Sequence, residues 1–468
     1  MTSHSQLSFH NKLPLFSLFS LHTLHATVAF CIRQMKNIIV VGSGISGLAS
    51  AWLLHNSGQY QVTLLEAADY FGGHSNAVDV QLDGASYPVD TGFLVFNHKT
   101  YPNLTQFFER LNVHTPDSDM SFGISVQQAK HRFIEWAGDD LSTVFAQKSN
   151  LLRPQFWHML ADIFRFGHFA NDYLAESEHE QLTLGQLLDR HHYSQSFQHN
   201  YLLPMGAAIW STAVADIRQF PAASFLNFCL NHVLLSVKGR PQWKTVGGSS
   251  RQYVQRIIEQ LPDTRLQHHV LSMDRQADHV TLTVATADQP DPIILQADAV
   301  VLACHTDQSL AILGQHASAN ERQILGDIRY APNQAILHTD LSQMPKHKKV
   351  WSSWNYLSNP HQDQSQPVAV TYWLNRLQPL PFRTPLLLTL NPITPIDPQK
   401  ILRRFDYAHP QMDSAALAAQ QRIHEIQGID RCYFAGAWGS YGFHEDGLKS
   451  AIRAVQHLGV TVPWNVAL

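Results

Sequence analysis

The chain is poor in the features that mark several large classes of protein. It has only four cysteines in 468 residues (Cys31, Cys229, Cys304 and Cys432), and no two of them form a CxxC pair. A disulfide-stapled fold and a cysteine-based zinc site are therefore not expected, and a reducing, cytoplasmic location fits better. No HExxH or similar ligand spacing occurs, so no metal site is predicted.

An excess of positive charge is also missing. Lys and Arg number 33 against 37 for Asp and Glu, and no basic run is interleaved with aromatic residues. This balance argues against a nucleic-acid partner. Repeats and low-complexity tracts are absent too, which predicts an ordinary globular protein. Histidine is unusually frequent, with 28 residues, and we attribute this excess to drift in surface composition.

The first 34 residues form an extension with two open interpretations. The segment from Leu13 to Ile32 carries no charged side chain and is long enough to span a bilayer. Serine, histidine and proline residues interrupt it, and it lacks a clear cleavage site. It is either a targeting or membrane segment or a stretch upstream of a true start at Met35. Membrane association has no support outside residues 13–32.

A strand–turn–helix–strand unit follows directly. The apolar run 37–41 predicts a buried parallel strand, 48–54 a helix and 61–66 a second strand. A Gly-x-Gly-x-x-Gly turn joins the first strand to the helix, and an acidic residue ends the second strand. This whole pattern is the dinucleotide-binding fingerprint, and it is far more specific than the glycines alone.

Each glycine of the turn has a separate physical role. Gly42 allows the tight turn, Gly44 lets the backbone approach a diphosphate, and Gly47 lets the helix pack closely on the strand. The helix N-terminus offers unpaired N–H groups to the phosphates. Glu66, 24 residues after Gly42, is placed to accept hydrogen bonds from ribose hydroxyls.

Further glycine-rich segments separate an FAD site from a simple NAD site. Residues 71–74 (Phe-Gly-Gly-His) offer a second close approach to a diphosphate, and 90–93 (Asp-Thr-Gly-Phe) follow them. Near the C-terminus, 431–438 read as a strand, followed by a loop and a helix starting near Asp446 and Gly447. A helix N-terminus there can hold negative charge on a reduced flavin ring.

Together these segments resemble the flavin-containing amine oxidoreductase superfamily, which includes monoamine oxidases, phytoene desaturases and protoporphyrinogen oxidases. The central glycine pair, at 247–250, and the return strand, at 299–304, also match. From about Met35 to Trp464 the chain is similar to a bacterial subgroup of predicted NAD/FAD-binding proteins. The matching segments of that subgroup include 239–243, 354–357, 372–376 and 441–447.

The resemblance implies an α/β fold in which a Rossmann-like FAD-binding domain of the GR2 type carries an inserted substrate domain of mixed β-sheet plus helices. The FAD-binding domain is expected to be discontinuous, comprising residues 35–100, 240–310 and 425–460. The substrate domain is expected over 101–239 and 311–424. Its helical part includes 151–173, where we expect Trp157, Phe164 and Phe166 to pack in the core.

FAD is the cofactor that the resemblance implies. The residues it assigns to cofactor binding are Gly42, Gly44, Ser46, Gly47, Glu66, Gly72, Gly73, His74, Thr91, Gly92, Phe93, Val270, Gly436, Asp446, Gly447 and Leu448. At His74 most of the superfamily has an arginine that meets the cofactor phosphates. A histidine there can contact the phosphates or ribitol, play a structural part, or carry a covalent flavin link.

The implied activity is that of an FAD-dependent oxidoreductase that removes a hydride from a small or apolar substrate of amine, polyene or acyl-chain type. Trp438, Tyr441, His444 and Glu445 are the candidate catalytic residues around the flavin ring. His444 could act as a general base, or His444 and Glu445 could instead pin the loop. Amine oxidases typically place a lysine near the flavin, and none of the options Lys238, Lys244 and Lys449 stands out, which disfavours amine oxidation.

Two other functions stay open at this point. One is a redox-neutral, flavin-dependent isomerase, and the other is a non-catalytic FAD-bound partner of a lipid-modifying enzyme. Members of the subgroup are often associated with cyclopropane-fatty-acid synthase-like proteins, which hints at a lipid-like substrate and at such a functional partner. Trp210, Trp243, Trp354 and Trp373 either line a substrate cavity or pack in the core.

Overall fold

The computed structural model describes residues 35–129, 132–176, 182–235, 239–358 and 368–468. Residues 1–34, with Cys31 and the apolar segment 13–32, lie outside the described residues, and so does Lys238. Within the described ranges, no helix combines the length and apolar character needed to cross a membrane.

A five-stranded parallel sheet forms one body of the fold, with the strand order β19-β13-β1-β2-β9. Its strands are β1 (Lys36–Val41), β2 (Tyr60–Leu65), β9 (Asp263–Arg265), β13 (Ala299–Leu302) and β19 (Cys432–Phe434). The central strands are apolar on both faces because helices cover them. Those helices include α1 (Ile45–Asn56), α10 (Arg251–Ile258), α11 (Thr306–Leu313), α12 (Ala319–Gly326), α14 (Ser414–Arg422) and α15 (His444–His457).

An antiparallel three-stranded sheet is attached to this body. It consists of β10 (His268–Arg275), β11 (Val280–Thr286) and β12 (Ile293–Ala297). The pairing of β10 with β11 shifts between Val270 and Ser272, which leaves Leu271 in a bulge. Smaller elements lie outside these two sheets: α2 (Pro102–Arg110), the hairpin of β3 (Ala77–Leu82) and β4 (Ala85–Asp90), and the short pair β5 (Asp117–Ser118) and β8 (Trp243–Lys244).

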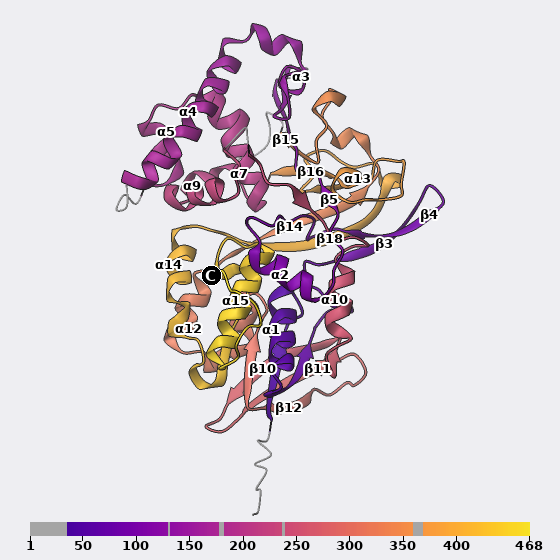
Figure 1. Ribbon diagram of the computed structural model, residues 1–468, viewed down its shortest axis with the longest axis vertical. Coiled ribbons are helices and arrows are strands. Elements are labelled where there is room, and N and C mark those ends of the chain that lie inside the picture. The colour runs from indigo at the N-terminus through magenta and orange to yellow at the C-terminus, as the bar shows by residue number, and fades with distance from the viewer. Residues whose placement is uncertain (1–34, 130–131, 177–181, 236–238, 359–367) are drawn as a thin grey trace, which may run out of the picture. The chain divides into compact units, whose positions relative to one another are not determined.

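The second body is built on a seven-stranded mixed sheet of order β18-β14-β17-β16-β15-β6-β7, in which only the β15–β6 pair is parallel. Its strands are β6 (Phe122–Ala129), β7 (Arg132–Ala137), β14 (Tyr330–His338), β15 (Trp354–Ser358), β16 (Ala369–Trp373), β17 (Leu387–Leu390) and β18 (Ile401–Pro410). Helices packed with it include α4 (Pro154–Glu176), α5 (Leu184–Arg190), α7 (Leu203–Trp210), α8 (Val214–Gln219) and α9 (Ala222–Asn231). In Figure 1, α4, α5, α7 and α9 lie to the left of β15 and β16, and α1, α10 and α15 lie below β14 and β18. The predicted fold class is confirmed.

One prediction about the core is wrong for two residues. Helix α4 begins three residues later than expected, and Phe166 is fully buried in the core, whereas Trp157 is 48% and Phe164 60% exposed. Trp157 and Phe164 are seven residues apart, so they share one helix face, and Phe166 points away from that face. The helix therefore buries the face of Phe166 and leaves the other two in solvent.

Candidate functional site

A cavity of about 670 Å³ is lined by residues of both bodies. This volume is within the range of small-molecule and cofactor sites. The parallel-sheet body contributes Gly42, Ser43, Gly44, Ser46, Glu66, Gly73, His74, Phe93, Val270, His305, Trp438 and His444, among others. The mixed sheet, its helices and nearby loops contribute Met120, Ile209, Trp210, Phe228, Trp243, Trp354, Tyr372, Leu390 and His409.

The glycine turn has the geometry that its sequence predicts. Gly42 has a φ of +97°, and a Cβ there would lie 2.9 Å from the carbonyl oxygen of Ala303. A Cβ on Gly47 would lie 1.8 Å from the carbonyl oxygen of Gly42, so helix α1 can approach the turn only with glycine there. Gly44 differs from both, because its Cβ position faces open space. It precedes α1 without a capping side chain, so the first N–H groups of the helix are free for a ligand.

Glu66 holds the turn from the end of β2. Its Oε2 accepts hydrogen bonds from the backbone N (2.8 Å) and Oγ (2.6 Å) of Ser43, and its Oε1 accepts one from Ala68 N (2.9 Å). A carboxylate has about four acceptor positions, so capacity remains for a ribose hydroxyl. Val270 also lines the cavity, directly before the β10 bulge, with its side chain buried.

The second glycine pair packs directly against the first turn. A Cβ on Gly73 would lie 3.0 Å from the Cα of Gly44, and Gly72 has a φ of +126° that favours glycine. The carbonyl of His74 accepts a hydrogen bond from Phe93 N (2.8 Å), and a Cβ on Gly92 would lie 2.1 Å from that same oxygen. The segments 72–74 and 91–93 therefore form one layer beside the glycine turn. Thr91 Oγ1 donates to the Asn76 carbonyl (3.0 Å) and closes this layer.

His444 stacks on Phe93, with ring centroids 3.7 Å apart and an interplanar angle of 15°. Its Nε2 lies 2.9 Å from Ser75 Oγ and 3.3 Å from the hydroxyl of Tyr253. Burial lowers the pKa of His444 to about 3, so the ring is neutral at ordinary pH. At Nε2 the neutral ring can exchange a proton with the hydroxyls of Ser75 and Tyr253.

Glu445 and Asp446 are engaged by backbone groups and do not line the main cavity. Glu445 accepts hydrogen bonds from the backbone of α2 at Asn103 (3.1 Å) and Leu104 (2.9 Å). Asp446 accepts one from Phe443 N (2.9 Å), and burial raises its pKa to about 6. Helix α15 thus begins at His444, two residues before the predicted start, because Asp446 closes its first turn.

The next two residues lock α15 against α1. Gly447 packs on Ile45 and Ser46, and its carbonyl accepts a hydrogen bond from Ser46 Oγ (2.9 Å). Leu448 is fully buried in the core next to them. These two residues and the Ser46 hydroxyl position the helix end that faces the cavity and supply little surface to it.

The loop between β19 and α15 supplies part of the cavity wall. Trp438 is 3% exposed, its Nε1 donates to the Cys304 carbonyl (3.1 Å), and it packs over Gly436. Tyr441 faces the cavity beside Phe228, with ring centroids 5.2 Å apart. Of the tryptophans considered from sequence, Trp210, Trp243 and Trp354 line the cavity, and Trp373 does not.

Histidines are the residues that sequence reasoning misjudged. Seven of them line the cavity: His74, His232, His268, His269, His305, His409 and His444. The expectation of surface drift is wrong for this set. His305 could have been noticed because it follows the return strand directly, but His409 on β18 has no local signal. Among the described residues, no three His, Cys, Asp or Glu side chains are arranged to hold a metal ion.

The lining has no Lys or Arg side chain within the described part of the chain. Lys244 is ion-paired with Asp117 (2.8 Å), and Lys449 lies beside a smaller, separate pocket together with Glu445 and Asp446. Glu66 is the one carboxylate among the described lining residues. The cavity therefore offers no fixed positive side chain.

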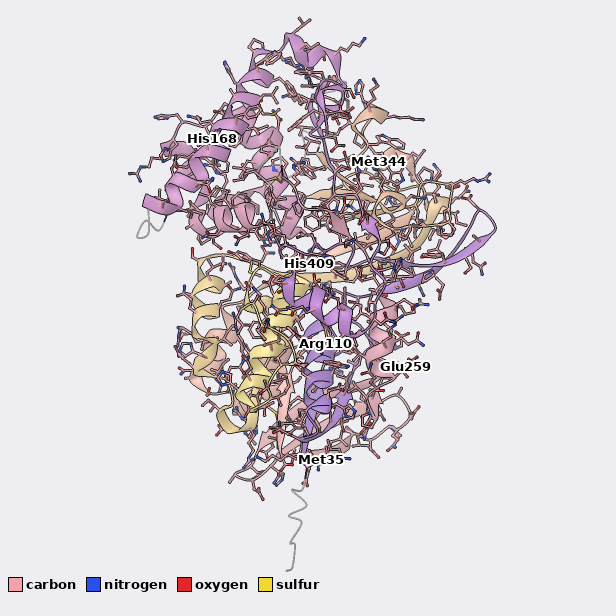
Figure 2. All side chains as sticks on the ribbon, viewed as in Figure 1. Met35, Arg110, His168, Glu259, Met344 and His409 are labelled. Atoms are coloured by element: carbon pink, nitrogen blue, oxygen red, sulfur yellow. The ribbon has the colours of Figure 1, made fainter. Side chains whose placement is uncertain are left out.

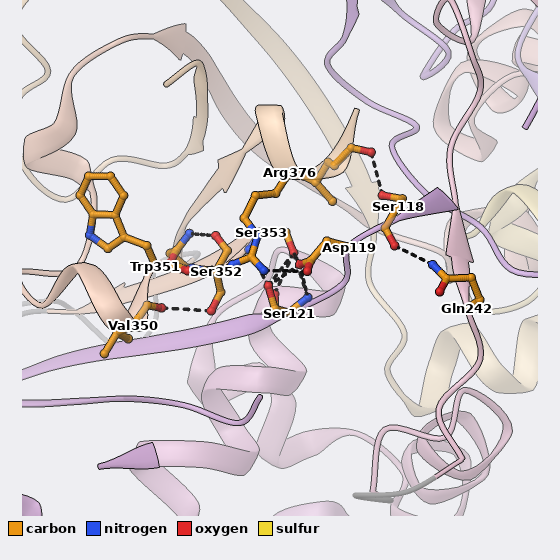
Figure 3. A network of polar contacts seen from close by, with 11 residues as sticks. Ser118, Asp119, Ser121, Gln242, Val350, Trp351, Ser352, Ser353 and Arg376 are labelled. Carbon is orange, nitrogen blue, oxygen red and sulfur yellow. Dashed lines mark hydrogen bonds and ion pairs between the residues drawn. The ribbon is translucent and has the colours of Figure 1, made fainter. Parts of the chain in front are cut away.

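A polar network holds the chain segments that carry the cavity residues Met120 and Trp354 (Figure 3). Asp119 forms an ion pair with Arg376 (2.8 Å) and accepts hydrogen bonds from Ser121 and Ser353. Arg376 in turn donates to the carbonyl of Trp351 (3.0 Å). Hydrogen bonds to Asp119 lower its pKa although burial opposes them. The network fixes the starts of β6 and β15, and with them the cavity residues Met120 and Trp354.

Comparison with known proteins adds independent findings. Residues 45–316 match the family model described as flavin containing amine oxidoreductase. A 1-hydroxycarotenoid 3,4-desaturase of Flavobacterium sp. (strain P99-3) is 37% identical over 102 residues, which is 22% of this chain and 19% of that protein. Flavin-containing amine oxidase B of Bos taurus is 26% identical over 264 residues, or 52% of this chain and 46% of the oxidase. The chain thus spans less than half the length of these relatives.

Solved structures extend the likeness over almost the whole chain. The crystal structure of a CLA-producing fatty acid isomerase from P. acnes aligns with a TM-score of 0.62 at 14% sequence identity, covering 90% of this chain and 98% of the isomerase. At this identity the likeness concerns the fold.

Proposed function

Because this chain belongs to the flavin-containing amine oxidoreductase family, we propose that it is an FAD-dependent oxidoreductase that removes a hydride from an apolar substrate of the polyene or acyl-chain type. The family implies FAD as the cofactor, and bound FAD supplies the acceptor for the hydride. The remaining questions are which residues hold it and what the rest of the cavity admits.

The residues present fit FAD. Gly44 has open space where a Cβ would stand, and it precedes the uncapped N-terminus of α1, as a diphosphate requires. Glu66 retains acceptor positions for a ribose. The layer of Thr91, Gly92 and Phe93, with His444 behind it, offers a wall for the flavin ring. We assign the diphosphate to the glycine turn and the ring to this wall.

The protein's own contribution is orientation and exclusion of water. Phe93 and Trp438 are nearly inaccessible and rigidly packed, so they form a fixed wall. Tyr441 and Phe228 close the cavity on the side of α9. His444 is neutral and is held by Ser75, so it adds no charge beside the flavin ring. We propose that His444 holds Phe93 in place against the ring and is not an obligatory base.

The observation that carries the proposed substrate class is the apolar wall. The side chains that line the cavity next to the mixed sheet and its helices are Met120, Ile209, Trp210, Phe228, Trp243, Trp354 and Leu390. No carboxylate of the described residues in this part could meet an ammonium group. Transfer of a charged amine into such surroundings is costly, whereas a hydrocarbon chain gains about 25 cal/mol for each Å² that it buries. The match to a carotenoid desaturase supports the same class.

The test is anaerobic mixing of the FAD-loaded protein with a carotenoid polyene, an unsaturated fatty acid and a primary amine. We expect loss of the visible flavin absorbance, with a substrate two hydrogens lighter, for one of the first two. Bleaching by the amine alone would contradict the proposal. Formation of an isomer of unchanged mass without an acceptor would also contradict it, and would favour a redox-neutral isomerase.

A matched pair of variants links the reaction to the apolar wall. Ile209→Asp places a carboxylate in the wall, and Ile294→Asp places one on β12, where the isoleucine is 59% exposed. We expect the first variant to reduce the rate of flavin bleaching at least about tenfold with unchanged FAD content, because a charge must be desolvated. The second should behave as the wild type. Equal rates in both variants would place the substrate elsewhere.

A further inference from the structure

The cavity lacks a positively charged side chain to balance the negative charge of the assigned cofactor. FAD carries a diphosphate with two negative charges, yet no Lys or Arg is found among the described lining residues. The dipole of α1 compensates about half a charge. The remaining candidates for neutralising the diphosphate are the histidines.

Three imidazoles converge on the glycine turn. Two of the backbone segments that touch the turn lead straight into a histidine. Gly73 packs on Gly44 and is followed by His74. Residues 303–304 pack on Gly42 and are followed by His305. The ring of His74 lies 5.4 Å from that of His409 and 6.3 Å from that of His305, centroid to centroid. Figure 2 shows His409 where the two bodies of the fold meet.

The three histidine rings differ in the partners that they contact. His409 Nδ1 lies 3.2 Å from the amide nitrogen of Asn333, which can only donate, so the ring proton of neutral His409 is on Nε2. His305 is stacked on Tyr330, with centroids 4.2 Å apart. His74 stands out because its Nε2 is buried and has no partner within the described part of the chain. That nitrogen therefore has no partner among the described residues that an oxygen of the diphosphate would have to displace.

We propose that His74 becomes protonated when FAD binds and supplies the positive charge against the diphosphate, while neutral His409 donates a hydrogen bond from Nε2. Cofactor binding is then coupled to the uptake of one proton. The proposal rests on FAD as the cofactor and is independent of the substrate that is oxidised.

The surroundings of His74 agree with this coupling. In the free protein, burial holds the pKa of His74 well below its usual value, and its histidine neighbours add to the effect. Other titratable groups near the cluster are Glu66, Tyr70, Cys304, Asp307, Tyr330, Tyr407 and His444. Glu66 is engaged by Ser43 and Ala68, and the Tyr407 hydroxyl by Thr91 and Asn76. The arriving diphosphate is thus the new charge that favours the protonated ring.

Calorimetric titration of the apoprotein with FAD tests the proposal. At one pH, buffers with different ionisation enthalpies report the number of protons taken up, and we expect about one. Between about pH 6 and about pH 9 the dissociation constant should rise by up to about tenfold per pH unit, as uptake of one proton requires.

Three variants assign the proton. His74→Arg carries a permanent charge, so FAD should bind without proton uptake and with little dependence on pH. His74→Gln should also lose the uptake and bind FAD at least about tenfold more weakly at the acidic end of the range. His232→Gln changes a cavity histidine at the end of α9, outside the cluster of His74, His305 and His409, and it should keep the wild-type uptake.

The results distinguish a failure of the proton-uptake proposal from a failure of the cofactor assignment. FAD binding by the wild type without proton uptake would overturn the proposal alone, and so would an uptake that persists in His74→Arg. A wild type that binds no FAD would overturn the cofactor assignment and the proposal together.

Discussion

Substitution of Glu445 separates a structural role from a catalytic one. Glu445 is 4% exposed and accepts hydrogen bonds from Asn103 N, Asn103 Nδ2 (2.7 Å) and Leu104 N. Helix α2 has no capping side chain of its own at Tyr101, so Glu445 serves as a cap supplied by another helix. Asn103 and Leu104 are fully buried, and water cannot replace the lost acceptor easily.

The expected size of the effect follows from these contacts. Loss of an ordinary N-cap costs about 1 kcal/mol, and each buried donor left unpaired costs about 1–3 kcal/mol. Glu445→Ala should therefore destabilise the protein by about 2–4 kcal/mol. Glu445→Gln keeps one oxygen for Asn103 but turns an NH₂ group toward Leu104 N, which should cost about 1–2 kcal/mol.

Guanidinium unfolding and the rate of flavin reduction are the two measurements. Glu259→Gln on the exposed surface of α10 is the matched control, and its stability should stay within about 0.5 kcal/mol of the wild type. We expect stability to fall in both Glu445 variants while the rate of flavin reduction in folded Glu445→Gln stays within about threefold of the wild type. A Glu445→Gln protein with wild-type stability and a rate reduced about a hundredfold would refute the capping role and make the carboxylate catalytic.

Three further outcomes follow from the structure. Gly44→Ala should fold normally but bind FAD at least about tenfold more weakly in a fluorescence titration, whereas Gly47→Ala should fail to fold because of its backbone clash; equal behaviour would contradict the assigned roles. The pKa of His444 lies near 3 in the folded protein, so stability should fall as pH drops from about 6.5 toward 3, by up to about 1.4 kcal/mol per pH unit. His444→Gln should flatten this slope in urea unfolding at several pH values, and an unchanged slope would contradict it. Asp119→Asn breaks the ion pair with Arg376 and should cost about 1–3 kcal/mol in guanidinium unfolding, against no change in Asp288→Asn on the surface.

Local sequence patterns predicted the parts of the site that local geometry determines. These parts are the glycine turn, the acidic residue after β2 and the layer at 91–93. Each is a short segment whose role can be predicted from its own residues. The same reasoning could not place His409, because its approach to His74 depends on where β18 lies in a sheet of seven strands. Nor could it reveal that Glu445 caps α2, a contact between residues more than 300 positions apart.

The errors have equally specific causes. Aromatic residues at helical spacing predicted a buried face of α4, but the pattern contained two faces, and only that of Phe166 meets the core. The histidine excess was attributed to surface drift because the histidines that share the cavity are scattered along the sequence. The assigned domain ranges stay predictions.

The hydrogen bond between Ser46 and Gly447 joins residues 401 positions apart. The dinucleotide-binding turn is therefore made well before the helix end that locks it, which follows 401 residues later. The first strand likewise acquires its neighbour β13 only after about 300 residues have been made. A nascent chain therefore presents an incomplete nucleotide cradle until α15 has been made, and cofactor loading must wait for that helix. Chains truncated before α15 should accumulate as colourless protein, so that flavin content reports whether synthesis has passed α15.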